Sequence, residues 1–284
     1  MITRIELDGF KTFQDFKLEL APFQVIVGPN GAGKSNLFDA LRLLSRLADV
    51  DLRSAFQALR GEAGELFTIL PDGRPVEKMR LAVEMFVDRQ VSDSWGAQAE
   101  LKYTRLRYEL EIARRTDEQG LERLCVTDER LIPIRREDDS WFRHHVSTAR
   151  EVWWPSLKRG RQGPFISTEE LETAIKPEKG TSISSEPEKT TKPEKGTLTI
   201  SIHQDGHGGR KASVAEKVER TVLSGVTNTE FPHAFAVREE MRTWGFLQLN
   251  PEVLRQPSSL MAQPLSPPMA AICPMRWPVC SRRT

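Results

Sequence analysis

The feature that most constrains this chain is a glycine-rich stretch near its start, VIVGPNGAGKSNLFDAL at residues 25–41. Within it, residues 28–35 fit the spacing Gly-x-x-x-x-Gly-Lys-Ser. The apolar run at residues 23–27 predicts a buried strand that ends at Gly28. Apolar residues then recur at helical spacing up to Ala48, which predicts a helix directly after the loop. A strand, a loop and a helix in this order are the context in which such spacing forms a phosphate-binding Walker A loop.

The residue types in the loop fit phosphate chemistry. Gly28, Gly31 and Gly33 permit a tight turn whose backbone N–H groups converge on phosphate oxygens, and the helix N-terminus adds positive potential. The Lys34 ammonium would lie between the outer phosphates, and the Ser35 hydroxyl would ligate the Mg2+ ion that bridges them. A chance match at the four fixed positions is expected in about one chain of this size in a hundred. We therefore expect ATP and Mg2+ as cofactors, with Ser35 as the metal-ligating residue.

Two strands are predicted before the loop. Residues 2–7 and 16–20 alternate apolar and polar side chains, as half-buried strands do, and the turn-prone pair Asp8 and Gly9 lies between them. The strand that leads into the glycine-rich loop would then be the third.

The stretch IELDGFKTFQDFKLEL at residues 5–20, followed by VIVGPNGAGKSNLFDAL, resembles the N-terminal half of SMC and RecF-like ATPases. It resembles more closely the bacterial AAA family ATPases that share this head, and the resemblance covers residues 1–48. Asn36 supports it, because transporter-type ATP-binding cassettes normally carry a threonine there. The resemblance implies an α/β fold of the P-loop NTPase class, an ABC/SMC-type head with an antiparallel β-lobe, incomplete at the C-terminus.

The same resemblance implies further nucleotide contacts. In those families the Phe-Lys-Ser/Thr-Phe turn lies near the nucleotide, so Lys11 and Thr12 are candidates for phosphate or ribose contacts. Asn30 is expected to touch the outer phosphate. The expected nucleotide-binding set is Lys11, Thr12, Gly28, Asn30, Gly31, Ala32, Gly33, Lys34, Ser35 and Asn36. No residue is assigned a catalytic role.

The middle of the chain predicts antiparallel strands. Apolar and polar residues alternate over residues 81–87 and 106–112, and a turn at residues 117–120 leads to a strand at residues 121–126. The stretch LCVTDE at residues 124–129 imitates a Walker B strand, which ends in Asp-Glu to steer Mg2+ and polarise water. Because Thr127 breaks the apolar run, we favour the hairpin. Residues 223–226, LSGV, lack the Gly-Gln of a signature motif, and we reject them as a site.

Two alternatives stay open for residues 141–161. This stretch mixes tryptophans with arginines, histidines and Lys158, which a DNA-binding surface would use for stacking and phosphate contact. The favoured alternative is that the aromatic side chains pack under the lobe and the cations are solvated.

The repeat KPEKGT marks residues 176–197, which have almost no large apolar side chain, so a disordered insertion is predicted. Helices are predicted at residues 212–223 and 234–244. His203 and His207 lie among glycines, which argues against a metal site there.

The composition favours a cytoplasmic protein. Lys and Arg number 41 against 40 for Asp and Glu, so any attraction to nucleic acid must come from local patches. No apolar run approaches the roughly 20 residues of a membrane-spanning helix, and no membrane partner is expected. The three cysteines, Cys125, Cys273 and Cys280, lack zinc-like spacing, and reduced thiols are expected.

Five segments are predicted along the chain. They are a P-loop half-domain with its β-lobe at 1–135, a basic and aromatic segment at 136–175, a disordered insertion at 176–211, a helical segment at 212–260 and an atypical tail at 261–284. The tail contains five prolines and no acidic residue, which is typical of translation in a shifted frame. We therefore expect a truncated head that lacks the signature motif and Walker B.

Three functions remain open at this stage. The first is a fragment of an ATPase linked to DNA repair or to defence against foreign DNA, as the resemblance implies. The second is a non-catalytic ATP-binding regulator, completed by a second copy or by a partner ATPase half. The third is a product without function.

Overall fold

The computed structural model describes residues 1–61, 63–116, 120–146, 163–170, 198–203, 210–214 and 219–246. These residues build one eight-stranded sheet in the order β10-β9-β8-β7-β6-β3-β1-β2, with a separate β4-β5 hairpin. The first strands are β1 (Ile2–Asp8), β2 (Phe16–Glu19), β3 (Lys78–Phe86), β4 (Gln90–Ser92) and β5 (Gln98–Glu100). They are followed by β6 (Arg105–Thr116), β7 (Glu122–Pro133), β8 (Ile166–Glu170), β9 (Leu198–His203) and β10 (Arg210–Val214). Every strand pair in both sheets is antiparallel.

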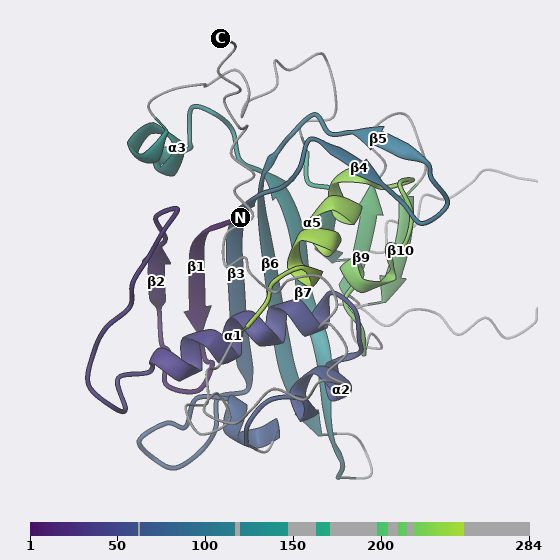
Figure 1. Cartoon of the computed structure of the whole chain (residues 1–284). Helices are drawn as coiled ribbons and strands as arrows, with labels where there is room; N and C mark the ends of the chain where they lie inside the picture. The colour runs from purple at the N-terminus through teal and green to yellow at the C-terminus, as the bar shows by residue number, and fades with distance from the viewer. Residues whose placement is uncertain are drawn as a thin grey trace, which may run out of the picture.

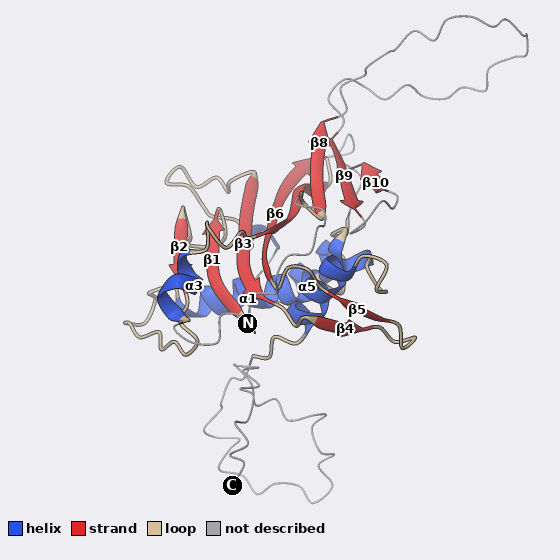
Figure 2. Ribbon diagram, turned by 90° about the horizontal axis from the view of Figure 1, so that it is seen from above, coloured by secondary structure: helices blue, strands red, loops and turns tan. Residues whose placement is uncertain are grey.

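Helices cover one face of the large sheet. The α-helices are α1 (Lys34–Leu47), α2 (Leu52–Gln57), α3 (Ser140–His145) and α5 (Pro232–Arg242), and the 3-10 helices are η1 (Ala63–Leu66) and η3 (Leu223–Gly225). In Figure 1, α1 runs across the strands in front of the sheet with α5 beside it, and Figure 2 shows both on the same side. None of the helices in the described ranges is long and apolar enough to span a membrane.

The core lies between α1 and the sheet because both present a periodic apolar face. Along β1, Thr3, Ile5 and Leu7 are buried while their neighbours are more exposed. The buried face of α1 includes Leu37, Leu41 and Leu44 at helical spacing. The apolar members of these two faces belong to one cluster of buried residues, so α1 is held by its side chains across the sheet.

Most predicted elements are confirmed. The two N-terminal strands, the helix after the glycine-rich loop, the strands β3 and β6 and the helix near residues 234–244 are all present. Residues 124–129 lie inside β7 and pair with β6, with Asp128 opposite Glu111. The hairpin interpretation of this stretch is therefore confirmed, and Gly120 at φ 79° lies in its turn.

The strand predicted at residues 23–27 is absent. The described part of the chain places no strand beside this segment and gives its backbone no ladder partner. Its apolar side chains remain at the surface; Phe23 is 83% and Val27 85% exposed. An apolar run forms a buried strand only where neighbouring strands pair with it.

Two predictions about residues 176–223 are also wrong in part. Residues 198–203 form β9 instead of belonging to a disordered insertion, because Leu198, Ile200 and Ile202 alternate and pair with β8. Residues 210–214 form β10 on β9, and residues 223–225 form a short 3-10 turn, so the helix predicted at 212–223 is not present. The repeat itself and the tail at 261–284 lie outside the described residues.

Of the two interpretations of residues 141–161, the packing of aromatic side chains holds for the first two aromatic residues. Trp141 and Phe142 lie in α3, are buried and contact Phe86. The fully buried Arg105 fixes α3 to the sheet: its Nε donates to Asp139 Oδ2 at 2.8 Å, and its guanidinium lies over the Trp141 ring. Residues 147–162, which carry most of the remaining cations, lie outside the described ranges.

Glu129 on β7 is the one carboxylate among the described residues whose pKa the structure raises to about 7. Burial raises the pKa, while hydrogen bonds from the backbone N–H groups of Leu223 and Val222 and from Tyr108 Oη partly oppose the rise. The two backbone bonds are 2.9 and 2.6 Å long, so Glu129 ties β7 to the η3 turn.

We predict that Glu129 makes stability fall as pH rises. Between the ordinary pKa of 4.5 and about 7 the folded chain holds more protons than the unfolded chain, so the free energy of unfolding decreases with pH across this window. The decrease is about 1.4 kcal/mol for each unit of pKa shift. Urea unfolding measured at pH 5 and pH 7 should show this slope in the wild type and lose most of it in Glu129→Gln. Glu122→Gln, at the solvent-facing start of the same strand, is the control and should keep the slope.

Candidate functional site

Two glycines of the glycine-rich loop adopt a left-handed backbone conformation. Gly31 and Gly33 have φ values of 84° and 85°, in the left-handed region that favours glycine. Gly33 is also the N-cap of α1, and a Cβ there would lie 3.5 Å from Thr12 Oγ1 and 3.7 Å from the Phe13 ring. Gly28 has no left-handed conformation, and a Cβ there would make an ordinary contact with Ala32 Cβ at 3.5 Å. The second and third glycines are therefore required by the turn.

The N-terminus of α1 is open toward the loop. Gly33 has no side chain to cap it, and the first turn of the helix carries no acidic residue. The first N–H groups of a helix have no intrahelical acceptor, and together with the helix dipole they attract anions. Asn30, Ala32 and Ser35 are exposed on and beside the loop, so a ligand can reach all three from solvent.

Lys34 spans the loop. Its ammonium donates to the carbonyl oxygens of Gly28 and Pro29, each at 2.7 Å. The cation is thereby held against the start of the loop. A phosphate at this position would meet both the Lys34 charge and the N–H groups of the helix terminus.

The Phe-Lys-Thr-Phe turn lies against the loop. Asn36 Nδ2 donates to Thr12 Oγ1 at 3.0 Å, which joins the turn to the first turn of α1. Lys11 points along the helix instead: its ammonium donates to Asp39 Oδ2 at 2.7 Å. The structure thus places Thr12 at the loop and Lys11 one helical turn farther along α1.

Asp39 and Arg60 are residues of this site that sequence reasoning missed. Asp39 lies one turn after Ser35, is buried, and accepts from both Lys11 and Arg60. Arg60 keeps 62% of its side chain exposed, so it places a second cation beside the loop helix. The sequence signal was weak, since one arginine followed by a glycine has no diagnostic spacing.

Neither residues 124–129, which imitate a Walker B strand, nor residues 223–226, which imitate a signature motif, have catalytic geometry. Asp128 lies on the sheet face that points away from α1, where it pairs with Arg130 at 3.1 Å. The Glu129 carboxylate is occupied by Val222, Leu223 and Tyr108. Residues 223–225 form η3, with Leu223 and Ser224 buried. Within the described ranges, neither stretch presents an acid or a signature motif to the loop.

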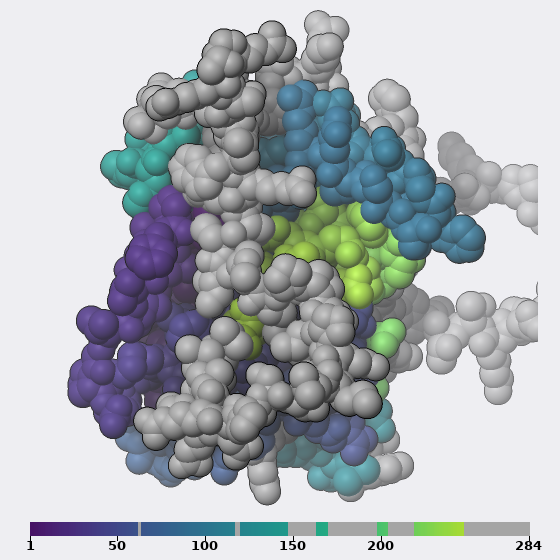
Figure 3. All heavy atoms as spheres, viewed as in Figure 1, coloured from purple at the N-terminus to yellow at the C-terminus, as the bar shows by residue number. Residues whose placement is uncertain are grey.

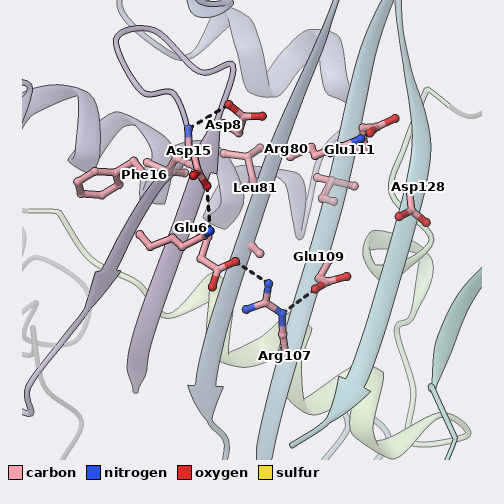
Figure 4. Close-up of a pocket in the computed structure, with 14 residues that line it drawn as sticks. Glu6, Asp8, Asp15, Phe16, Arg80, Leu81, Arg107, Glu109, Glu111 and Asp128 are labelled. Atoms are coloured by element: carbon pink, nitrogen blue, oxygen red, sulfur yellow. Dashed lines mark hydrogen bonds and ion pairs between the residues drawn. The ribbon is translucent and has the colours of Figure 1, made fainter. Parts of the chain in front are cut away.

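A second concave surface, of about 330 Å3, lies on the sheet face away from α1 (Figure 4). Arg107 pairs there with Glu6 at 2.7 Å and with Glu109 at 2.6 Å, and Arg80 pairs with Glu111 at 2.7 Å. Burial alone would raise the pKa of Glu111, but hydrogen bonds from Lys78, Arg80 and Thr127 lower it to about 2. The side chains that line this surface include six acidic and three basic ones, so it lacks the excess positive charge that attracts nucleic acid.

Comparison with known proteins identifies the first part of the chain. Residues 1–58 match the family model described as RecF/RecN/SMC N terminal domain. The N-terminal part of this chain is an SMC/RecF-like, ABC-type head segment. The head segment is 33% identical over 112 residues to "Chromosome partition protein Smc" of Thauera aminoaromatica. It is 42% identical over 50 residues to "OLD nuclease" of Thermus scotoductus.

The alignments cover only part of this chain and a small part of each relative. The Smc alignment covers 37% of this chain and only 9% of the relative, and the OLD nuclease alignment covers 18% and 9%. A solved structure described as "Structural biochemistry of ATP-driven dimerization and DNA stimulated activation of SMC ATPases" aligns with 18% identity and a TM-score of 0.29. It covers 44% of this chain and 69% of that one. The antiparallel sheet fits the β-lobe expected of an α/β P-loop ATPase head.

Figure 3 shows where the head segment meets solvent. The purple atoms of the N-terminal part stand along the left edge of the face viewed. The loop therefore lies at the periphery of the described structure, in agreement with the exposure of Gly28 and Asn30.

We predict that Asp39 is a structural support of the site. Asp39→Ala leaves Lys11, whose side chain is 14% exposed, without its carboxylate partner and should lower the free energy of unfolding by about 3 kcal/mol. Urea denaturation measures the change. Glu100→Ala is the matched control, because the half-exposed pair of Glu100 with Arg89 should be worth less than about 1 kcal/mol. Equal effects of the two variants would contradict a supporting role for Asp39.

Proposed function

We propose that this chain binds Mg2+-ATP at residues 28–35 and does not hydrolyse it alone. The observation that carries the proposal is that one continuous segment supplies three groups: the loop with two left-handed glycines, the uncapped N-terminus of α1 and the Lys34 ammonium. Each of these groups favours an anion, and the spacing between them is set by the loop.

Each residue of the loop then has a separate task. Lys34 exchanges the Gly28 and Pro29 carbonyl oxygens for the outer phosphates, and the Ser35 hydroxyl ligates Mg2+. Asn30 contacts the outer phosphate. Thr12, whose hydroxyl accepts from Asn36 beside the loop, would supply a phosphate or ribose contact.

Hydrolysis requires groups that the described residues do not bring to the loop. An acid that polarises water and a signature motif that closes over the nucleotide would come from a second polypeptide, either a second copy or a partner ATPase half. Support for a DNA-linked role comes from the names of the relatives, a chromosome partition protein and a nuclease. A cytoplasmic location agrees with this role.

The test is the affinity of a fluorescent ATP analogue for the full chain in the presence of Mg2+. Lys34→Ala removes a charge-assisted hydrogen bond worth about 1.5–3 kcal/mol, so binding should weaken about 10- to 100-fold. Lys17→Ala, on the far side of the sheet, is the control and should bind like the wild type. Equal affinity of the wild type and Lys34→Ala would refute the proposal.

A second prediction concerns the metal. Ser35→Ala should lose the Mg2+-dependent part of the affinity, so its dissociation constant in Mg2+ should equal the one measured in EDTA. The wild type should bind more tightly in Mg2+ than in EDTA. A Ser35→Ala chain that still responds to Mg2+ would place the ion elsewhere.

A further inference from the structure

The hydroxyl group of Thr12 lies beside the phosphate loop with a defined hydrogen-bond polarity. Its Oγ1 accepts from Asn36 Nδ2 at 3.0 Å. A hydroxyl that accepts one hydrogen bond still has its own proton to donate. Within the described ranges, no acceptor takes the proton of Thr12. Thr12 is exposed, so this proton is available to a ligand.

The same hydroxyl is close to the N-terminus of α1. A Cβ at Gly33, the N-cap residue of the helix, would lie 3.5 Å from Thr12 Oγ1. Lys34, Ser35 and Asn36 are the first three residues of α1, and N–H groups at such positions have no acceptor within the helix. Thr12 therefore adds a side-chain donor next to backbone donors that attract an anion.

The turn that carries Thr12 is held in a strained backbone conformation. Lys11 has a φ of 48°, in the left-handed region that is unfavourable for a residue with a side chain. Its N–H donates to the Leu66 carbonyl at 2.8 Å, and the N–H of Phe13 donates to the Phe10 carbonyl at 2.8 Å. Contacts on both sides of Thr12 thus fix its position. Backbone strain that is held in this way is typical of functional sites.

We propose that Asn36 is a positioning residue, which makes the Thr12 hydroxyl a donor to a phosphate oxygen of the bound nucleotide; this inference rests on the proposed function. Because the Asn36 amide donates to Oγ1, the Thr12 proton is left for another acceptor. Ionised phosphate oxygens accept hydrogen bonds and do not donate them. A hydrogen bond to an ionised acceptor is also about twice as strong as one between neutral groups, which favours phosphate over ribose.

The affinity of the full chain for a fluorescent ATP analogue in Mg2+ tests the donor. Thr12→Val has a similar shape without the hydroxyl, and it should weaken binding about 10-fold because a hydrogen bond to a charged group is lost. Thr12→Ser keeps the hydroxyl and should retain most of the affinity. Gln14→Val, at an exposed position of the same turn, is the matched control and should bind like the wild type.

A double-mutant cycle tests the role of Asn36. Asn36→Ala should weaken ATP binding about 3-fold while Thr12 is present. It should have little further effect in the Thr12→Val chain, because no hydroxyl remains to be positioned. Equal effects of Asn36→Ala in both chains would contradict positioning. The midpoint of urea unfolding, measured for each variant, reports whether the fold is retained.

Inorganic tripolyphosphate distinguishes a phosphate contact from a ribose contact, because it contains no sugar. It should displace the fluorescent analogue from the wild type, and Thr12→Val should weaken its binding by the same factor as that of ATP. Weaker ATP binding with unchanged tripolyphosphate binding would move the Thr12 contact to the ribose and overturn the proposal.

The Lys34→Ala variant separates failure of this proposal from failure of the proposed function. If Lys34→Ala weakens ATP binding while Thr12→Val and Asn36→Ala bind like the wild type, the positioning role is overturned and the proposed function stands. If Lys34→Ala also binds like the wild type, both are overturned.

Discussion

The packing of α1 against the sheet is the interaction on which the rest of the structure depends. Its buried leucines share a single apolar cluster with Ile5 and Leu7 of β1. Its C-terminal end is fixed by hydrogen bonds from Thr221 Oγ1 to the Leu47 carbonyl and from Arg238 Nε to the Ala48 carbonyl, at 2.9 and 3.1 Å. A helix held along its face and at its end presents its N-terminus, and hence the glycine-rich loop, in a fixed direction.

Buried charges connect the surrounding elements to this helix. Asp39 joins α1 to the Phe-Lys-Thr-Phe turn through Lys11, Glu129 joins β7 to η3, and Arg105 joins β6 to α3. Removing one partner from such a pair is costly because the other charge stays buried. Each contact therefore fixes which segments meet, while the apolar core supplies the driving force for their association.

Nucleotide binding and nucleotide hydrolysis need different groups. Binding needs converging N–H groups, a cation and a hydroxyl, and one continuous segment of 28–35 provides them. Hydrolysis needs groups that approach from another direction. In the described residues the other side of the loop is bordered by the exposed apolar segment 23–27. Because residues 23–27 have no neighbouring strand among the described residues, the loop that follows them is accessible from solvent.

The sequence by itself determined the local features: the loop spacing, the α1 helix and the β6-β7 hairpin. These depend on residue periodicity and on glycine conformations, which neighbouring residues encode. Tertiary structure decided the rest, because contacts between distant residues have no local signal. Residues 23–27 have the composition of a buried strand but no described neighbour. A helix is predicted at residues 212–223, yet residues 210–214 pair with β9. The partners of Asp39 and Glu129 likewise appear only when strands and turns far apart in the chain meet.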